Sequence, residues 1–334
     1  MPVRYLDLMN EITAPLPPMP IVQLGAPTLA PMRRPLREST VLIVSSAGVH
    51  VRSDPPFQFV DDLTCRRLDQ GLAPTAVRPC HPSPIRRPGR QDINVVHPYQ
   101  RLAELAAAGS IGRPSPFHLA TLGAIKQVTR IVTELGPAVA AEATAAGADL
   151  ALIVPLCPAC HQAMGLLARV VERAGIPTVS VTGARDITER VRPPRAAYLD
   201  FPLGYSLGRP GLAEEQRAVV GEVLALSERV SVPGEIVDLP YRWPDEGWQE
   251  EVVAHYHEER DIVMGQRTKE FAAGQAAGTH AGAAPATVGD ELGGAVPAEP
   301  AAAGGHAVDP AALGRHLALD EVRTVEDMAR AGLV

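Results

Sequence analysis

Residues 148–181, ADLALIVPLCPACHQAMGLLARVVERAGIPTVSV, decide the fold class of this chain. They open with a continuous apolar run at 150–154, which has the length and composition of a strand buried on both faces of a parallel sheet. Apolar residues then recur at helical spacing over 162–174, and a second buried strand is predicted at 178–181. Strand, helix and strand in this order predict part of a mostly parallel α/β sheet.

Two cysteines, Cys157 and Cys160, lie where the first of these strands gives way to the helix. In open α/β sheets, ligands bind outside the carboxyl ends of the strands. A thiol near a helix N-terminus also receives amide hydrogen bonds and a favourable dipole, and both lower a thiol pKa. The C-x-x-C motif is therefore predicted to be a reactive-thiol position at the ligand-binding edge of the sheet.

The same alternation continues through an α/β domain predicted at 37–271. The pattern predicts further strands at 41–45 and 196–199, and helices at 99–108, 119–134, 184–191 and 212–228. Alternation with apolar strands predicts a doubly wound, Rossmann-like sheet, mostly parallel and covered by helices on both faces.

Three flanking segments differ from this domain in composition. A Pro-rich N-terminal arm is predicted at 1–36, with a short helix at 5–12. An Ala/Gly/Pro-rich flexible linker is predicted at 272–309. After it, 310–334 regains the spacing of a C-terminal helical segment.

Composition limits the classes of partner and compartment. The chain has 334 residues and a formal net charge of -7, which argues against nucleic acid and membrane surfaces as partners. Neither a secretory signal nor a membrane-spanning run is visible, so the cytoplasm is the expected location. The four cysteines then indicate catalytic, metal-binding or core thiols rather than a disulfide framework. The sequence contains no phosphate-binding glycine motif, so nothing in it predicts a nucleotide cofactor.

Four kinds of chemistry compete for the segment CPACH at 157–161. Attachment of c-type haem uses this pattern but requires a translocated chain. A zinc or iron site needs further ligands, which Cys65, or Cys80 with His81, would have to supply. A redox dithiol needs only two thiols, one attacking and one resolving, and Pro158 between them is typical of helix-start redox pairs. Two inert core cysteines are the fourth interpretation. The dithiol is preferred.

The chain contains four ordered blocks: SSAGVHVRSDPPF (45–57), DINVVHPYQRLAELAAAGSIG (92–112), LIVPLCPACHQAMGLLARVVERAGIPTVSV (152–181) and FPLGYSLGRPG (201–211). Together they resemble the glycine/sarcosine/betaine reductase selenoprotein B and D-proline reductase family. The resemblance covers roughly residues 3–230. In the selenium-containing relatives, a selenocysteine lies in the cysteine block and corresponds to Cys157, so this chain resembles a cysteine-containing, non-selenium homologue.

The resemblance implies reductive cleavage of a carbon–heteroatom bond, of C–N type, in a small carboxylated, amino-acid-like substrate. In the family, a partner subunit with a pyruvoyl group holds the amine, and the selenolate attacks the activated carbon. A neighbouring thiol then releases the product. Carried over, Cys157 is the nucleophile and Cys160 the resolving thiol. An ordinary thiol, with a pKa of about 8.5, is only slightly ionised at neutral pH, so this site has to lower that pKa or react more slowly.

Further residues are predicted to bind the substrate. Small residues after the first strand offer amides for a carboxylate, with a tight turn as the alternative interpretation. Four histidines lie in or near the resembling blocks. One of them, His118, precedes a predicted helix and is a candidate general acid or base. The predicted set is Ser45, Ser46, Gly48, His50, His97, His118 and His161.

Two other signals are interpreted conservatively. The run HYHEE at 255–259 is predicted to be a solvated helix rather than a metal site, because histidines two residues apart point to different sides. The loop at 78–90, with Cys80 and His81, is predicted to have no role in the chemistry, with a lid as the alternative.

Cofactor and partner predictions follow from the dithiol. No organic cofactor is certain; a thioredoxin-like thiol reductant and a second reductase subunit are expected, and a homo-oligomer is left open. The rival hypothesis is a metal-binding (zinc or iron) or non-catalytic partner subunit that uses Cys157 and Cys160 as ligands or as a docking loop.

Overall fold

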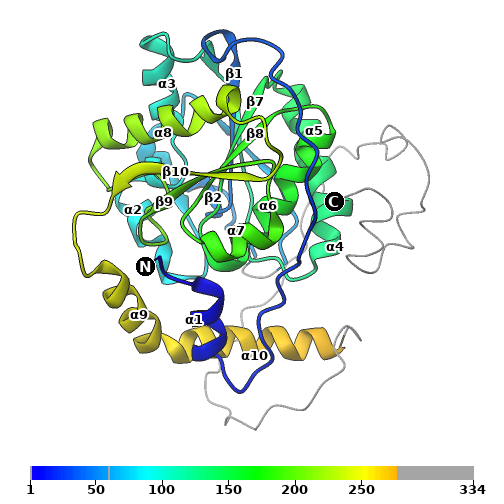
Figure 1. Cartoon of the computed structure of the whole chain (residues 1–334), viewed down its shortest axis with the longest axis vertical. Helices are drawn as coiled ribbons and strands as arrows, with labels where there is room; N and C mark the ends of the chain where they lie inside the picture. The colour runs from blue at the N-terminus through cyan, green and yellow to red at the C-terminus, as the bar shows by residue number, and fades with distance from the viewer. Residues whose placement is uncertain (1, 59–60, 277–334) are drawn as a thin grey trace.

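A computed structural model describes residues 2–58 and 61–276 of the chain (Figure 1). Its centre is an eight-stranded sheet, and two further strands, β2 (Val49–Val51) and β4 (Val77–Pro79), form a separate antiparallel pair. The strands of the large sheet are β1 (Thr40–Ser45), β3 (Arg66–Asp69), β5 (Arg113–Pro114), β6 (Phe117–Ala120), β7 (Leu150–Val154), β8 (Thr178–Thr182), β9 (Arg195–Asp200) and β10 (Glu235–Arg242).

The sheet has the order β10-β9-β8-β7-β1-β6-β3, with β5 beside β1. All neighbours are parallel except β3, which runs antiparallel to β6. Helices cover both faces, so the predicted Rossmann-like α/β class is confirmed. The helices are α1 (Tyr5–Ile12), α2 (Arg87–Gln91), α3 (Tyr99–Ala107), α4 (Val128–Arg130), α5 (Gly136–Ala145), α6 (Pro158–Arg173), α7 (Arg185–Val191), α8 (Ala213–Arg229), α9 (Trp248–Glu258) and α10 (Arg260–Ala276).

Strict alternation of side chains along β1 and β7 builds two core layers. Successive residues of a strand point to opposite faces, and every residue of these two strands is buried. One layer lies under α5, α6 and α7, and the other under α3 and α8. The first layer contains Leu42, Val44, Ala151 and Ile153, and the second contains Val41, Ile43, Leu150 and Leu152.

Most of the predicted elements are confirmed, but the helix predicted at 119–134 is wrong over residues 119–127. Phe117–Ala120 is instead strand β6, paired between β1 and β3. Helical structure starts only at α4 and continues through a π-helical turn, Ile131–Leu135, into α5. A short apolar run is compatible with a buried strand and with a buried helix, and here the pairing with β1 makes it a strand.

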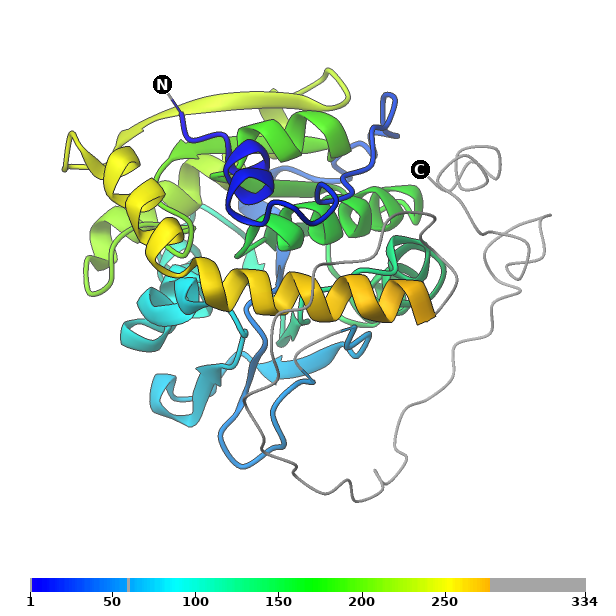
Figure 2. The same cartoon turned by 90° about the horizontal axis from the view of Figure 1, so that it is seen from below.

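The first helix of the chain contacts the last two helices of the described region. Helix α1 occupies the range predicted for it, and α9 and α10 pass beside it across the lower side of the domain (Figure 2). Helix α10 continues to Ala276, past the predicted linker start; the rest of that linker and the segment predicted at 310–334 lie outside the described residues. In the described ranges, no helix is long and apolar enough to cross a membrane.

Candidate thiol site

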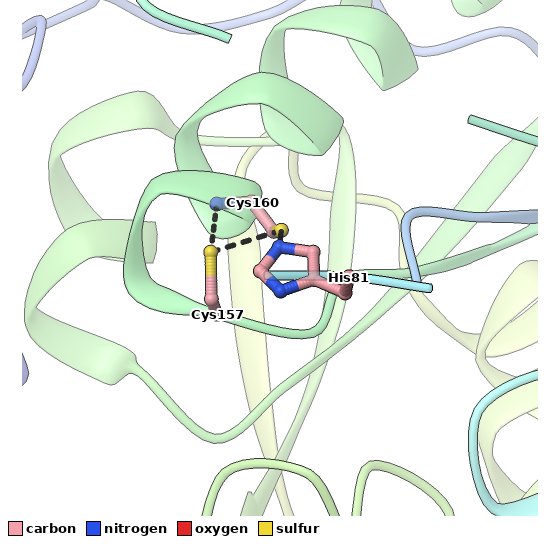
Figure 3. Close-up of side chains that lie close together, drawn as sticks. All are labelled: His81, Cys157 and Cys160. Carbon is pink, nitrogen blue, oxygen red and sulfur yellow. Dashed lines mark hydrogen bonds between the residues drawn. The ribbon is translucent and has the colours of Figure 1, made fainter. Parts of the chain in front are cut away.

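The C-x-x-C motif lies at the carboxyl end of β7, where α6 begins. Cys157 has extended backbone geometry and is the N-cap of α6, and its Sγ accepts a hydrogen bond from the Cys160 amide at 3.3 Å (Figure 3). Pro158 occupies the first helical turn, where its missing N–H costs no hydrogen bond and its fixed φ suits a helix. The local sequence thus places both sulfurs at the start of the helix.

The two sulfurs are close enough for redox chemistry. Both cysteines are free thiols, and Cys157 Sγ lies 3.0 Å from Cys160 Sγ. A disulfide bond is about 2.05 Å long, so closing one needs only a small movement. The arrangement is that of two free thiols in contact.

A histidine from a distant loop completes the group. His81 follows β4, and its Nε2 lies 3.3 Å from Cys160 Sγ (Figure 3). The Ser83 amide donates to His81 Nδ1 at 3.1 Å. Since Nδ1 is an acceptor, the proton of the neutral ring is on Nε2, which therefore donates toward Cys160.

The hydrogen bonds separate the acidities of the two thiols. Burial alone would raise the pKa of Cys160, but the hydrogen bond from Cys157 and the interactions with His81 and Ser46 outweigh burial and hold that pKa well below its usual value. Burial raises the pKa of Cys157 well above its usual value, and the neighbouring Cys160 charge raises it further. The lower of the two pKa values therefore belongs to Cys160, and the higher one belongs to Cys157.

Cys157 is the sulfur that faces the cavity. Cys157, His81 and Tyr256 line a cavity of about 310 Å³ whose walls come from α1, the loop after β4, the start of α6 and helices α9 and α10. Cys160 is fully buried behind Cys157. Because the sulfurs share one proton at 3.0 Å, moving that proton onto Cys160 leaves a thiolate on Cys157, facing the cavity.

Two known proteins are similar to the chain over much of its length. The D-proline reductase subunit gamma of Acetoanaerobium sticklandii is 26% identical over 236 residues, which are 71% of this chain and 95% of the relative. The glycine reductase complex component B subunit gamma of Carboxydothermus hydrogenoformans is 26% identical over 217 residues, 60% of this chain but only 47% of that relative.

The chain is a homologue of these reductase subunits. The predicted resemblance to the selenoprotein B and D-proline reductase family is therefore confirmed. No family model matches the chain. No solved structure matches it either.

In this reductase homologue, the seven residues predicted to bind substrate do not line the cavity beside Cys157. Ser46 supports the site from behind: its Oγ accepts the Leu156 amide at 3.0 Å, and its carbonyl lies 4.0 Å from Cys160 Sγ. His161 donates from Nδ1 to the Cys157 carbonyl at 2.8 Å. His161 otherwise faces a separate space of about 10 Å³, enough for little more than one water molecule.

Three other predicted residues form a separate buried group on the neighbouring strands. Ser45 Oγ lies 2.8 Å from His97 Nδ1, and the His97 and His118 rings are 5.8 Å apart. His118 lies within β6 rather than before a helix, and its Nδ1 accepts the Ile43 amide. Burial lowers the pKa of His97 to about 3 and lowers that of His118 well below its usual value, so both rings stay neutral.

The remaining two predicted residues form the turn after β1. Gly48 adopts a φ of +64°, a conformation that favours glycine, and its carbonyl lies 3.1 Å from His50 Nδ1. Arg78 donates to His50 Nε2 at 3.2 Å. The Gly48 amide is used by the Thr121 carbonyl, so it is not open to a carboxylate.

The loop at 78–90, predicted to have no role in the chemistry, brings His81 to the thiols. The sequence shows a Cys-His pair in this loop, but no local sequence pattern relates that pair to residues 157–160. Gly123 is a second residue that sequence reasoning missed. A Cβ on Gly123 would lie 2.7 Å from Cys160 Sγ and 2.8 Å from the Ser46 Cβ, so only glycine leaves room for the second thiol.

The site also has the donor set of a metal centre. The ligand atoms of His81, Cys157 and Cys160 all lie within 4.8 Å of one another. In the part of the chain that the structure describes, neither Cys65 nor Cys80 joins them as a fourth ligand. Three ligands with an open fourth position resemble catalytic rather than structural zinc sites, which are closed by four protein ligands.

Proposed function

We propose that this chain is the thiol-bearing subunit of a multi-component reductase. It cleaves a carbon–heteroatom bond, of C–N type, in a small carboxylated, amino-acid-like substrate. The observation that carries the proposal is the pair of reduced sulfurs 3.0 Å apart, one of which faces a cavity. The names of the two relatives, both subunits of reductases, support it.

The chemistry balances with two thiols and no other electron source. Cys157 transfers its proton to Cys160 and attacks the carbon, forming an S–C bond while the C–N bond breaks. The amine leaves with the proton of Cys160. The Cys160 thiolate then attacks Cys157 Sγ, forming the disulfide and breaking the S–C bond, and the electron pair of that bond takes up a proton from water on carbon. A dithiol reductant of the thioredoxin kind returns the disulfide to two thiols.

His81 supports the resolving step. Its Nε2–H points at Cys160 Sγ, so it stabilises the thiolate that attacks the Cys157 adduct. Its Nδ1 accepts the Ser83 amide, which fixes the orientation of the ring toward Cys160.

Serine variants of each cysteine test the proposal. In Cys160→Ser the adduct on Cys157 has no resolving thiol, so intact-protein mass spectrometry should show a substrate-derived adduct. Cys157→Ser should show none, and the wild type should instead accumulate the Cys157–Cys160 disulfide. The substrates are a panel of α-substituted small carboxylates, supplied with the co-purified partner subunits. If neither adduct nor disulfide forms with any of them, the reductase chemistry is wrong.

The three-ligand arrangement favours one rival, a zinc- or iron-binding or non-catalytic docking subunit. Elemental analysis of protein purified without chelators distinguishes the two functions. Stoichiometric metal that disappears in His81→Ala, Cys157→Ser and Cys160→Ser would replace the dithiol mechanism. Metal below about one tenth of an equivalent in the active protein would reject the metal centre.

A further inference from the structure

The hydrogen bonds of His81 oppose the metal centre that its position suggests. The side chain is buried, and its Nε2 faces Cys160 Sγ (Figure 3). Its other ring nitrogen, Nδ1, accepts the Ser83 amide at 3.1 Å. Turning the ring over about its Cβ–Cγ bond would put carbon atoms at both positions and lose both contacts. One orientation of the ring is therefore fixed.

The loop after β4 holds the Ser83 amide in place. Arg86 Nη1 donates to the Pro82 carbonyl at 2.8 Å and to the Ser83 carbonyl at 3.0 Å. The His81 amide donates to the Ala47 carbonyl at 3.2 Å, which ties the loop to the turn after β1. The amide that faces Nδ1 thus belongs to a folded loop, and it cannot turn away without breaking these hydrogen bonds.

A histidine that binds a metal needs the opposite arrangement of its ring proton. The ligating nitrogen carries no proton, and the other nitrogen donates its N–H to an oxygen acceptor. At His81, the group that faces Nδ1 is a backbone N–H, which can only donate. Binding a cation through Nε2 would either bring two N–H donors together at 3.1 Å or require an imidazolate ring. His81 therefore has the position of a metal ligand but the tautomer of a hydrogen-bond donor.

We propose that the Ser83 backbone amide determines the specificity of the thiol site: it holds His81 as an Nε2–H donor, which weakens the binding of Zn²⁺ and other thiophilic cations. Ser83 is a positioning residue, because it acts on the sulfurs only through His81. The two thiols then remain available for oxidation and reduction. The inference rests on the proposed function for this last step and on the hydrogen-bond geometry for the exclusion of metal.

Nitrogen NMR of the imidazole rings tests the tautomer. In isotope-labelled protein that has been reduced and stripped of metal, His81 should show a protonated Nε2 and an unprotonated Nδ1 at neutral pH. The His81 signals are assigned by their absence from His81→Gln. A ring protonated at Nδ1, or at both nitrogens, would overturn the proposal.

Competition with a chromophoric chelator measures the affinity for Zn²⁺ without any substrate. Because His81 is not a ligand, His81→Ala should bind Zn²⁺ with a Kd within about threefold of the wild-type value. His81→Cys supplies a third sulfur that needs no tautomer, so it should bind Zn²⁺ at least about a hundredfold more tightly. A large loss of affinity in His81→Ala, or equal affinities of wild type and His81→Cys, would contradict the exclusion of metal.

An amide-to-ester change at residue 83 tests the role of Ser83. Lactic acid, introduced at this position by suppression of a stop codon, replaces the N–H by an ester oxygen. Ser83→Ala is the matched control, because it has the same side chain and keeps the N–H. Without the N–H, the ring proton can move to Nδ1, and we expect the ester to bind Zn²⁺ at least about tenfold more tightly than Ser83→Ala. Adding His81→Ala should abolish this gain. Equal Kd values for the ester and Ser83→Ala would reject the role of the amide.

The results distinguish a failure of this inference from a failure of the reductase function. The tautomer and the Zn²⁺ affinity are measured without substrate, whereas the adduct on Cys157 and the disulfide report the reduction. If the ester binds Zn²⁺ more tightly as expected but no substrate yields an adduct or disulfide, the reductase function fails and the exclusion of metal stands. If adducts form but the ester and Ser83→Ala have equal Kd values, the exclusion of metal is rejected and the thiol chemistry stands.

Discussion

At the scale of single residues, His81 acts most directly on the reactive sulfurs. His81→Leu removes the N–H that points at Cys160 Sγ, so the thiolate loses a charge-assisted hydrogen bond, worth about 1.5 to 3 kcal/mol. We expect thiolate absorbance to appear at higher pH and alkylation at neutral pH to slow about tenfold. His81→Gln, which can still donate, should recover part of the rate. Identical pH profiles for wild type and His81→Leu would exclude this role.

The pH profile of the wild type follows from the opposite shifts of the two thiols. Because the pKa of Cys160 is lowered, the first thiolate should persist below the ordinary thiol range of about 8.5, and reactivity should fall only as the pH drops through the lowered pKa. Because the pKa of Cys157 is raised, a second thiolate should appear only above that range. Ultraviolet thiolate absorbance against pH measures both steps. Simultaneous ionisation of the two thiols near 8.5 would contradict the shared proton.

Gly123 limits what can surround Cys160. Gly123→Ala places a Cβ within 3.0 Å of Cys160 and of Ser46, so one of them has to move. Overpacking of this kind costs about 1–3 kcal/mol of stability, and we expect slower oxidation of the dithiol by diamide. Gly247→Ala, at a glycine with nothing within 4 Å, is the matched control and should change neither quantity. Normal oxidation kinetics in Gly123→Ala would show that the contact is easily relieved.

At the scale of elements, helix α10 closes the cavity while making few contacts with the domain. Val263 is its buried anchor, and Ile262, the preceding residue, is 52% exposed. Val263→Asp puts an unpaired carboxylate into apolar surroundings and should detach the helix. We expect Cys157 to be alkylated several times faster, with Ile262→Asp unchanged, as followed by mass spectrometry of the alkylated peptide. Equal rates in both variants would mean that α10 does not control access.

At the scale of the whole molecule, a buried ion pair ties the N-terminal arm to the core. Arg195 Nη1 lies 2.6 Å from Glu172 Oε1, both side chains are almost fully buried, and the two residues hold the amide and the carbonyl of Ala30. Glu172→Gln leaves a buried charge without its partner and should lower the free energy of unfolding by about 3–5 kcal/mol, measured by urea denaturation.

An exposed ion pair is the control for this prediction. Glu222 lies 3.5 Å from Arg229 on the surface of α8. Glu222→Gln should change the free energy of unfolding by less than about 1 kcal/mol. A similar loss in both variants would show that burial does not distinguish the two pairs.

The elements around the thiols were predictable because their signals are local. The strand at 150–154, the helix at 162–174 and the strand at 178–181 each depend on residues close in sequence. All three are confirmed, and α6 begins earlier than predicted, at Pro158. The wrong prediction within 119–134 has a non-local cause. Whether Phe117–Ala120 forms a strand depends on its partners β1 and β3, which are distant in sequence.

The sequence by itself determined the α/β class, the relation to the reductase subunits and the place of Cys157 and Cys160 at a strand end, since periodicity, capping and block order are properties of neighbouring residues. Only the tertiary structure decided what surrounds the sulfurs. His81, Gly123 and Tyr256 come from three segments far from residues 157–160, and packing of the sheet, the loop after β4 and helix α9 brings them together. The acidity of the thiols and the chemistry of the cavity depend on burial and hydrogen bonds between these segments, which no local pattern encodes.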